Sequence, residues 1–328
     1  MAGSWTSTFC AEVTMSDLIA RTLPIYGLSP DTPAALINRS ENDTWAAGDL
    51  ILRLHRPGYH TKPEIAAELA WLNALQDLPG LNAVRPVAGS QGFVTEIDGR
   101  FLVAFARISG QELQPGDDLA RWFAPLGEIT ARLHLHAREW IRPPGFARLR
   151  WDLPGILGPN PNWGHWRQSQ GLDRHGEAVL ARATEALSAR LRAYGTGPEV
   201  FGLIHADLRL ANLMIDGDRL TAIDFDDCGF GWWAYDLAAA LSFIETDPRL
   251  PDLIARWCEG YARITTLRPE DRAMIPSLIL LRRVLLTGWL ASRADSDTAA
   301  ALDGPGYTAG TLDLADRYLT DGLAAFRP

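Results

Sequence analysis

The chain has 328 residues, of which 47% are hydrophobic and 22% charged, and its formal net charge is −9. This composition excludes a wholly disordered chain and leaves room for two domains or for one two-lobed domain. The negative charge argues against a nucleic-acid partner, because phosphate backbones select basic surfaces.

Cysteine usage and hydropathy favour a cytoplasmic protein. The three cysteines are Cys10, Cys228 and Cys258. They have no metal-ligand or Cys-x-x-Cys spacing, so we interpret them as reduced thiols. No basic residue precedes Arg21, so the N-terminus lacks the charged region of a secretory signal. The most apolar late stretch, 278–290, is interrupted by Arg282 and Arg283 and is too short to cross a membrane.

The first third of the chain has the pattern of an antiparallel sheet. Residues 15–23 predict a helix, and a turn-rich connection follows. The predicted strands are residues 35–39, 44–47, 50–55, 84–88, 92–97 and 101–107. They are short, rich in apolar residues and separated by polar or glycine-containing turns, so we expect five or six strands.

Arg53 is the unusual residue of this region. Alternation along residues 50–55 places it on one face between Ile51 and His55, in the centre of an apolar strand. A buried charge there needs a partner. Protein-kinase-like lobes carry a phosphate-binding lysine at this strand position, but Lys62 is the only lysine of this chain. Arginine can replace it through a planar, bidentate fork; a surface arginine on an edge strand is the alternative.

The remainder of the chain is mainly helical. Residues 63–75 have helical spacing, and two glutamates lie one turn apart on this helix. Further helices are predicted at 172–193, 237–244, 253–264, 272–292 and 312–326, with a Gly-Pro-Gly break at 304–306 before the last. Residues 141–166 form an irregular insert rich in Pro, Gly and Trp. Its aromatic faces suit a substrate ammonium, although packing within the loop is the alternative.

The chemistry is concentrated in residues 200–237. Three apolar β-like runs in this stretch end in polar residues, which leaves Asp207, Asn212 and Asp224 at strand ends, where side chains can face one cleft. The pattern His205-x-Asp207-x4-Asn212, followed by Asp224, is that of kinase-type phosphoryl transfer. In that chemistry the first aspartate accepts the hydroxyl proton, and the asparagine and second aspartate bind Mg²⁺.

The motifs of competing chemistries are missing from the sequence. It contains no Gly-x-Ser-x-Gly elbow, no Gly-x4-Gly-Lys-Ser/Thr loop and no Gly-x-Gly-x-x-Gly fingerprint. The 7 histidines are dispersed, whereas metal hydrolases cluster theirs. Kinase-type transfer is therefore the interpretation that order, spacing and flanking strands jointly favour.

The motif resembles the aminoglycoside phosphotransferase/choline kinase family, most closely its homoserine-kinase-like and stress-response-kinase-like branch. Residues 126–134 also resemble this family's Leu-Gly-x3-Ala-x-Leu-His helix. The resemblance implies an α+β, protein-kinase-like bilobal fold. Residues 1–108 would form a small lobe with a five- or six-stranded antiparallel sheet and one helix, and residues 109–328 a larger, mostly helical lobe. It also implies ATP and Mg²⁺ as cofactors.

The resemblance further assigns nucleotide-binding residues to the small lobe. Asn42 ends a polar loop that would contact phosphate, although this segment also suits an ordinary hairpin turn. Glu68 would pair with Arg53, with the other glutamate of the same helix as the alternative. The backbone from Phe105 to Ile108 would bind the adenine.

Four residues near the motif receive supporting roles. His205 would brace the catalytic loop, and Asp236 would buttress it as a structural residue. Arg209 would reach the γ-phosphate, with a surface position as the alternative. Asp226 lies on the same side of an extended segment as Asp224 and would contact a second metal or a substrate amine.

The predicted function is transfer of the γ-phosphate of Mg-ATP to a hydroxyl of a small, amine-bearing metabolite such as homoserine, choline or an aminoglycoside. Between Asp224 and Asp236 there is no room for a long activation loop, which favours a small acceptor over a protein. The stress-response kinases share this short segment, so a Ser/Thr protein kinase is the alternative. A nucleotide-binding scaffold without activity is a third hypothesis. We expect no nucleic-acid or membrane partner.

Overall fold

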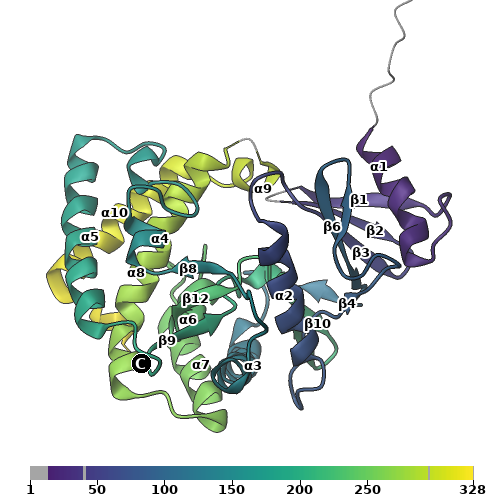
Figure 1. The fold of residues 1–328 in the computed structure, drawn as a ribbon. Coiled ribbons are helices and arrows are strands. Elements are labelled where there is room, and N and C mark those ends of the chain that lie inside the picture. Colours follow the sequence, from purple (N-terminus) through teal and green to yellow (C-terminus); the bar gives the residue numbers. More distant parts are fainter. Residues whose placement is uncertain (1–13, 40–41, 295, 328) are drawn as a thin grey trace, which may run out of the picture. The chain divides into compact units, whose positions relative to one another are not determined.

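The computed structural model describes residues 14–39, 42–294 and 296–327. The chain divides into two compact units: unit 1 comprises Met1–Tyr59 and Pro86–Arg107, and unit 2 comprises His60–Arg85 and Ile108–Pro328 (Figure 1). The helix-containing segment His60–Arg85 packs with unit 2, although it precedes the expected lobe boundary at residue 108. The backbone crosses from unit 1 to unit 2 at Arg107–Ile108, within the segment expected to bind adenine.

Unit 1 is built on a six-stranded antiparallel sheet in the order β1-β2-β3-β6-β4, with β5 also paired to β6. The strands are β1 (Ala34–Arg39), β2 (Asp43–Ala47), β3 (Leu50–Leu54), β4 (Pro86–Val87), β5 (Thr95–Ile97) and β6 (Arg100–Ala106). Each overlaps a predicted strand. Helix α1 (Met15–Thr22) begins with a capping box between Thr14 and Asp17, and the 3-10 turn η1 (Leu23–Tyr26) follows it. Leu18 and Ile19 of α1 are buried in one cluster with leucines of β3 and β6.

Unit 2 is mostly helical. Its helices are α2 (Lys62–Leu75), α3 (Leu119–Glu139), α4 (Leu153–Leu157), α5 (Arg174–Tyr194), α6 (Tyr235–Ala240), α7 (Leu250–Ile264), α8 (Pro269–Ser292), α9 (Asp297–Ala300) and α10 (Gly304–Asp321). Strands β7 (Gln111–Glu112), β10 (Leu213–Asp216) and β11 (Arg219–Ala222) form one three-stranded sheet, and β8 (Leu149–Trp151), β9 (Phe201–Ile204) and β12 (Gly229–Trp232) form another. Helices α5, α8 and α10 pack against one another (Figure 1).

Two glycines allow helices α3 and α7 to touch through their backbones. A Cβ on Gly127 would lie 2.1 Å from the carbonyl oxygen of Trp257, and one on Gly260 would lie 1.9 Å from that of Ala124. Real Cβ atoms do not approach that closely, so only glycine fits at either position. The contact fixes α3, which carries His134, against α7.

The predicted break at residues 304–306 is wrong. These residues form the first turn of α10, where Asp303 caps the helix by accepting a hydrogen bond from the Gly306 N–H at 3.0 Å. Pro305 is accommodated there because the first turn of a helix needs no N–H from it. Helix α6 is also shorter than the predicted 237–244, and Phe243 beyond it has a left-handed φ of +69° that no helix continues through.

Helix α8 is the one helix in the described residues that is long and apolar enough to cross a membrane. However, 94% of that stretch is buried inside the protein, as in the core helices of globular proteins. Both Arg282 and Arg283 lie in it, and each forms an ion pair with a carboxylate.

Candidate active site

A β-hairpin brings the two predicted metal ligands to one place. Strands β10 and β11 are antiparallel, with Leu213 opposite Ala222, and the Ile223 N–H donates to the Asn212 carbonyl at 3.0 Å. The backbone hydrogen bonding between the two segments therefore extends one residue beyond each strand. Asn212, which precedes β10, and Asp224, which lies two residues after β11, are at the same end of the hairpin. Asn212 is buried, whereas Asp224 is exposed.

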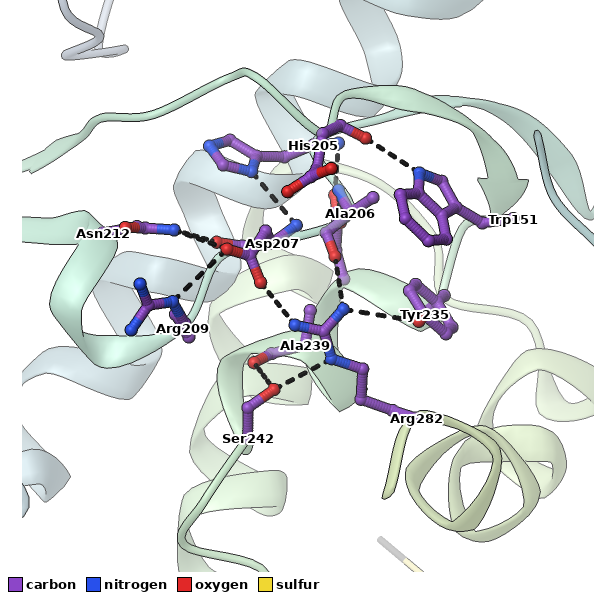
Figure 2. A network of polar contacts seen from close by, with 12 residues as sticks. Trp151, His205, Ala206, Asp207, Arg209, Asn212, Tyr235, Ala239, Ser242 and Arg282 are labelled. Atoms are coloured by element: carbon purple, nitrogen blue, oxygen red, sulfur yellow. Dashed lines mark hydrogen bonds and ion pairs between the residues drawn. The ribbon is translucent and has the colours of Figure 1, made fainter. Parts of the chain in front are cut away.

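Asp207 lies at the centre of the polar network (Figure 2). Its Oδ2 accepts a hydrogen bond from Asn212 Nδ2 at 2.8 Å and a longer one from Arg209 Nε at 3.4 Å. Its Oδ1 accepts from Arg282 Nη2, on helix α8. Asn212 Nδ2 also donates to the Asp207 carbonyl at 2.8 Å, so the asparagine fixes both backbone and side chain. The carboxylate thus has donors from its own loop and from a distant helix.

The charges around Asp207 keep its carboxylate ionised. Burial alone raises the pKa of Asp207, but the guanidinium groups of Arg282 and Arg209 outweigh it and hold that pKa below its usual range. At neutral pH the group is therefore an acceptor of hydrogen bonds and protons.

Asp236 braces the backbone before Asp207. Its carboxylate accepts hydrogen bonds from the backbone N–H groups of His205 at 3.1 Å and Ala206 at 2.6 Å, and it lies 3.0 Å from His134 Nε2. Ala206 has a left-handed φ of +67°, which strains a residue with a Cβ. These contacts are those expected of a structural buttress, and they stabilise the strained turn.

His205 connects the catalytic loop to the hairpin. Its Nδ1 accepts from the Asp207 N–H at 3.3 Å, so the ring proton belongs on Nε2, which donates to the Ile223 carbonyl at 3.1 Å. The ring also packs 4.3 Å from the Phe225 ring, centroid to centroid. Burial lowers the pKa of His205, so the ring is neutral. His205 thus holds Asp207 and the residue before Asp224 together through hydrogen bonds from a neutral ring.

The residues present fit a hard divalent cation. Because Asn212 uses its amide nitrogen on Asp207, its amide oxygen is the atom suited to a metal. Asp224 adds an exposed carboxylate from a backbone with a left-handed φ of +59°. The described residues contain no cluster of three His, Cys, Asp or Glu side chains for a metal. This is consistent with Mg²⁺, which takes one or two protein oxygens and completes its shell with phosphates and water.

Asp226 lies beside residues that the sequence analysis did not identify. Its carboxylate Oδ1 is 3.5 Å from Nε2 of His60, and both side chains are buried. Arg148 donates to the backbone carbonyls of Asp226, Cys228 and, at 2.8 Å, Glu64. A single buried arginine therefore ties the start of α2 to the segment that follows Asp224.

The predicted nucleotide-binding residues are divided between the two units. In unit 1, Arg53 is 4% exposed on the interior strand β3, so it is not a surface arginine of an edge strand. Its guanidinium carbon lies 5.1 Å from the centroid of the Phe105 ring. Asn42, also in unit 1, accepts from the Arg56 N–H at 3.0 Å. Ser40 and Glu41 of the same polar loop, like Cys10, lie outside the described residues.

Glu68 and Ile108 belong to unit 2. Glu68 is fully buried in α2, where it interacts electrostatically with Arg148. Its pairing with Arg53 of unit 1 remains a prediction, as does adenine binding between Phe105 and Ile108.

The tryptophans of the irregular insert make contacts within the protein. The Trp163 ring faces the Arg282 guanidinium at 4.7 Å, and the Trp166 ring faces that of Arg167 at 4.3 Å. Trp151 donates from Nε1 to the Asp227 carbonyl at 2.8 Å. The cations on the rings of Trp163 and Trp166 therefore come from the chain itself, as the loop-packing alternative expects.

Arg282, like His60 and Arg148, is a residue of the site that sequence reasoning missed. Its signal in the sequence is a pair of arginines inside an otherwise apolar predicted helix. From the sequence alone this pair indicates only that the hydrophobic run is interrupted. In the structure Arg282 is 1% exposed and contacts the predicted catalytic base.

The model of the phosphotransferase enzyme family (APH) matches residues 35–272. The chain belongs to this family. Amicoumacin kinase of Bacillus subtilis is 24% identical over 88% of both chains. A homoserine kinase of Methylobacterium radiotolerans is 28% identical over 61% of this chain and 60% of its own length. The structure of a microcompartment-associated aminopropanol kinase superposes with a TM-score of 0.86 at 41% identity, covering 94% of this chain and 98% of that one.

These likenesses confirm the predicted family, the α+β protein-kinase-like fold and the predicted enzyme class. The protein is an ATP-dependent kinase with an alcohol group as acceptor, from a family whose members phosphorylate small metabolites. The solved structure of an amicoumacin kinase, 22% identical with a TM-score of 0.74, contains AMP-PNP and Ca²⁺. ATP is the phosphate donor of this enzyme class, and Mg²⁺ as the metal ion of this protein remains a prediction.

Proposed function

We propose that this protein transfers the γ-phosphate of Mg-ATP to the hydroxyl of a small amino alcohol of the aminopropanol type. The acceptor class is supported by the 41% identity to the aminopropanol kinase, which extends over 94% of the chain. A net charge of −9 is compatible with a cationic acceptor. Homoserine and choline are less favoured acceptors.

The observation that carries the proposal is the ionised Asp207 carboxylate, held by Arg282, Asn212 and Arg209. The acceptor hydroxyl gives its proton to Asp207 while its oxygen forms a bond to the γ-phosphorus, and the bond to the ADP oxygen breaks. Asn212 and Asp224 would hold Mg²⁺, which neutralises phosphate charge when bound.

The remaining assignments are part of the same proposal. Arg53 and Asn42 would contact the nucleotide phosphates, with Glu68 as the partner of Arg53, and the backbone from Phe105 to Ile108 would bind adenine. Arg209 would turn toward the γ-phosphate. For the acceptor amine or a second metal, Asp226 is the candidate. Because the reaction consumes ATP and Cys228 and Cys258 are free thiols, we also propose a cytoplasmic location.

A substrate panel tests the proposal. The purified protein is incubated with Mg-ATP and, separately, an aminopropanol, ethanolamine, choline, homoserine or an aminoglycoside, and ADP release and ³¹P NMR follow the product. We expect the highest kcat/KM with the aminopropanol and a phosphate monoester as product. Transfer of labelled phosphate to casein or to the protein itself, with no turnover of any amino alcohol, would establish the protein-kinase alternative instead.

A further inference from the structure

The guanidinium of Arg282 is fixed by four partners inside unit 2. Nε donates to Ser242 Oγ at 3.0 Å, Nη1 donates to the Ala206 carbonyl at 3.2 Å and to the Tyr235 hydroxyl at 3.5 Å, and Nη2 donates to Asp207 Oδ1. Figure 2 shows the guanidinium among these groups. One face of the guanidinium lies 4.7 Å from the Trp163 ring. A planar group held at its edge and on its face has little freedom to move.

One of these contacts holds the backbone of Ala206, the residue with a strained backbone that precedes the proposed base Asp207. Ala206 has a left-handed φ of +67°. Its N–H donates to Asp236 at 2.6 Å, and its carbonyl accepts from Arg282 at 3.2 Å. Asp236 therefore holds the backbone N–H of Ala206 and Arg282 holds its carbonyl. Arg282 also contacts the Asp207 carboxylate.

The two oxygens of Asp207 are occupied differently. Within the described part of the chain, Oδ2 accepts from Asn212 and Arg209, whereas Oδ1 accepts from Arg282 alone. A carboxylate oxygen has two lone-pair directions. Once Arg209 turns toward the γ-phosphate, as proposed above, Asn212 remains on Oδ2 and Arg282 on Oδ1, and each leaves one direction open for the acceptor hydroxyl. The carboxylate is therefore held at both of its oxygens, by Asn212 from its own loop and by Arg282 from helix α8.

We propose that Arg282 is a positioning residue that fixes the orientation in which the Asp207 carboxylate receives the acceptor's proton, an inference that rests on the proposed function. The hydroxyl O–H bond breaks and its proton passes to the Asp207 carboxylate, while the hydroxyl oxygen bonds to the γ-phosphorus. The bond from the γ-phosphorus to the bridging oxygen breaks, and ADP leaves with its electron pair. Arg282 gives up no proton in this step. Its contribution is to hold the carboxylate in the reactive orientation.

The adjacent Arg283 supplies a matched control. It is also buried on α8, forms an ion pair with a buried carboxylate at 2.5 Å (Glu245), and lies over an aromatic ring at 3.9 Å (Tyr307). The two arginines thus share burial, ion pairing and aromatic contact. The hydrogen bonds of Arg283 go to Glu245, Thr311 and Tyr307, none of which belongs to the catalytic loop.

The test compares Arg282→Met and Arg282→Lys with Arg283→Met and Arg283→Lys. Steady-state kinetics with the aminopropanol and ATP give kcat and both Michaelis constants of each variant, and thermal unfolding gives its melting temperature. We expect Arg282→Met to lose on the order of 10²-fold in kcat with both Michaelis constants nearly unchanged, because misplacing a reacting group by about 1 Å has that effect. Arg282→Lys should recover part of kcat, because it restores a donor to Oδ1.

Chemical rescue separates positioning from folding. Guanidinium chloride at non-denaturing concentration should raise kcat of Arg282→Ala by about tenfold or more if the ion occupies the vacated place, and should leave Arg283→Ala unaffected. Equal losses of kcat in the Arg282 and Arg283 variants, or wild-type kcat in Arg282→Met, would overturn the proposal.

A crystal structure of Arg282→Met decides the inference even if the acceptor has been misidentified. We expect the Asp207 carboxylate to rotate or become disordered in that variant. An unchanged, ordered Asp207 would refute the positioning role. If the wild-type protein phosphorylates none of the alcohols, the proposed function fails, and the orientation of Asp207 still tests Arg282.

Discussion

At the scale of single residues, Asp207 combines two requirements that normally conflict. A general base must be able to accept a proton, yet this carboxylate is paired with Arg282, which favours its charged form. Phosphoryl transfer tolerates a weak base, because the proton leaves the hydroxyl late in a loose transition state. In the proposed mechanism, orientation of the hydroxyl is then the larger part of the contribution of Asp207.

Replacing Asp207 with Asn tests its role as base. Asn keeps the shape and can still accept a hydrogen bond, but it has no charge to take up a proton. We expect kcat to fall by roughly 10²- to 10⁴-fold. Binding of AMP-PNP, measured by calorimetry, should change little.

The same variant will also be less stable, because Arg282 loses its counter-charge in a buried position. The assay is therefore run well below the melting temperature of the variant. Full turnover by Asp207→Asn would rule out the proposed base.

At the scale of elements, His134 joins helix α3 to the bracing aspartate. Its Nε2 lies 3.0 Å from Asp236 Oδ2 and its Nδ1 lies 3.0 Å from the Tyr261 hydroxyl of α7. Burial lowers the pKa of His134 in the folded protein, despite the nearby carboxylate. The ring is therefore neutral when folded, but in the unfolded chain it takes up a proton near its ordinary pKa of about 6.5.

Stability should consequently fall as the pH falls below about 6.5, because the unfolded chain then binds more protons than the folded one. The contribution of His134 to the free energy of unfolding is fully present above that pH. It is lost as the pH approaches the lower pKa that His134 has in the folded protein. Urea unfolding from pH 8 to pH 5 measures the slope. The His134→Gln protein should be less stable than the wild type at pH 8. Its free energy of unfolding should fall less on acidification, the two slopes differing by up to about 1.4 kcal/mol per pH unit. Identical slopes would contradict this assignment. Burial also lowers the pKa of His136, His165 and His205, so these histidines contribute to the slope that remains in the variant.

The close approach of α3 and α7 gives a second test at this scale. A Cβ at Gly260 would lie 1.9 Å from the Ala124 carbonyl, so Gly260→Ala must push the two helices apart. We expect a loss of about 2 kcal/mol or more in the free energy of unfolding, the upper range for overpacking. Gly116→Ala is the control, because a Cβ there meets nothing within 4 Å. A Gly260→Ala protein as stable as this control would show that the contact is absent.

The elements and the local part of the site were predictable because their signals are local. Asp207, Asn212 and Asp224 come together through a loop and one hairpin, so their spacing along the chain determines their proximity. The start of α10 was missed because a Gly-Pro-Gly sequence usually indicates a loop. The one residue that makes these three residues the first turn of a helix is Asp303, which caps it. Arg282 was missed because its partner lies 75 residues earlier, and only the packing of α8 brings them together.

At the scale of the whole molecule, ligand binding should stabilise the fold by mass action. AMP-PNP with Mg²⁺ at about 100 times its Kd is expected to add roughly 2.7 kcal/mol to the unfolding free energy, seen as a higher melting temperature. If Asn212 and Asp224 hold the metal ion as proposed, EDTA should reduce this gain, because no ion is then left to bind beside the phosphates.

Asp224→Asn provides the matched variant. Asn tolerates the left-handed φ of +59° at this position better than other residues with a side chain, so the backbone is retained while the charge is removed. We expect its melting temperature with AMP-PNP to be the same with Mg²⁺ as with EDTA. A full Mg²⁺ effect in this variant would exclude Asp224 as a metal ligand.

The long separation between Asp207 and Arg282 also has a consequence during synthesis. The ribosome makes the catalytic loop 75 residues before the arginine that orients it, and helix α8 must then pack before the two can meet. Until that moment Asp207 lacks its buried ion pair with Arg282, and the carbonyl of the strained Ala206 lacks its donor from the same arginine. We therefore expect a nascent chain to be unable to consume ATP until α8 has left the ribosome and packed against the loop that contains Asp207.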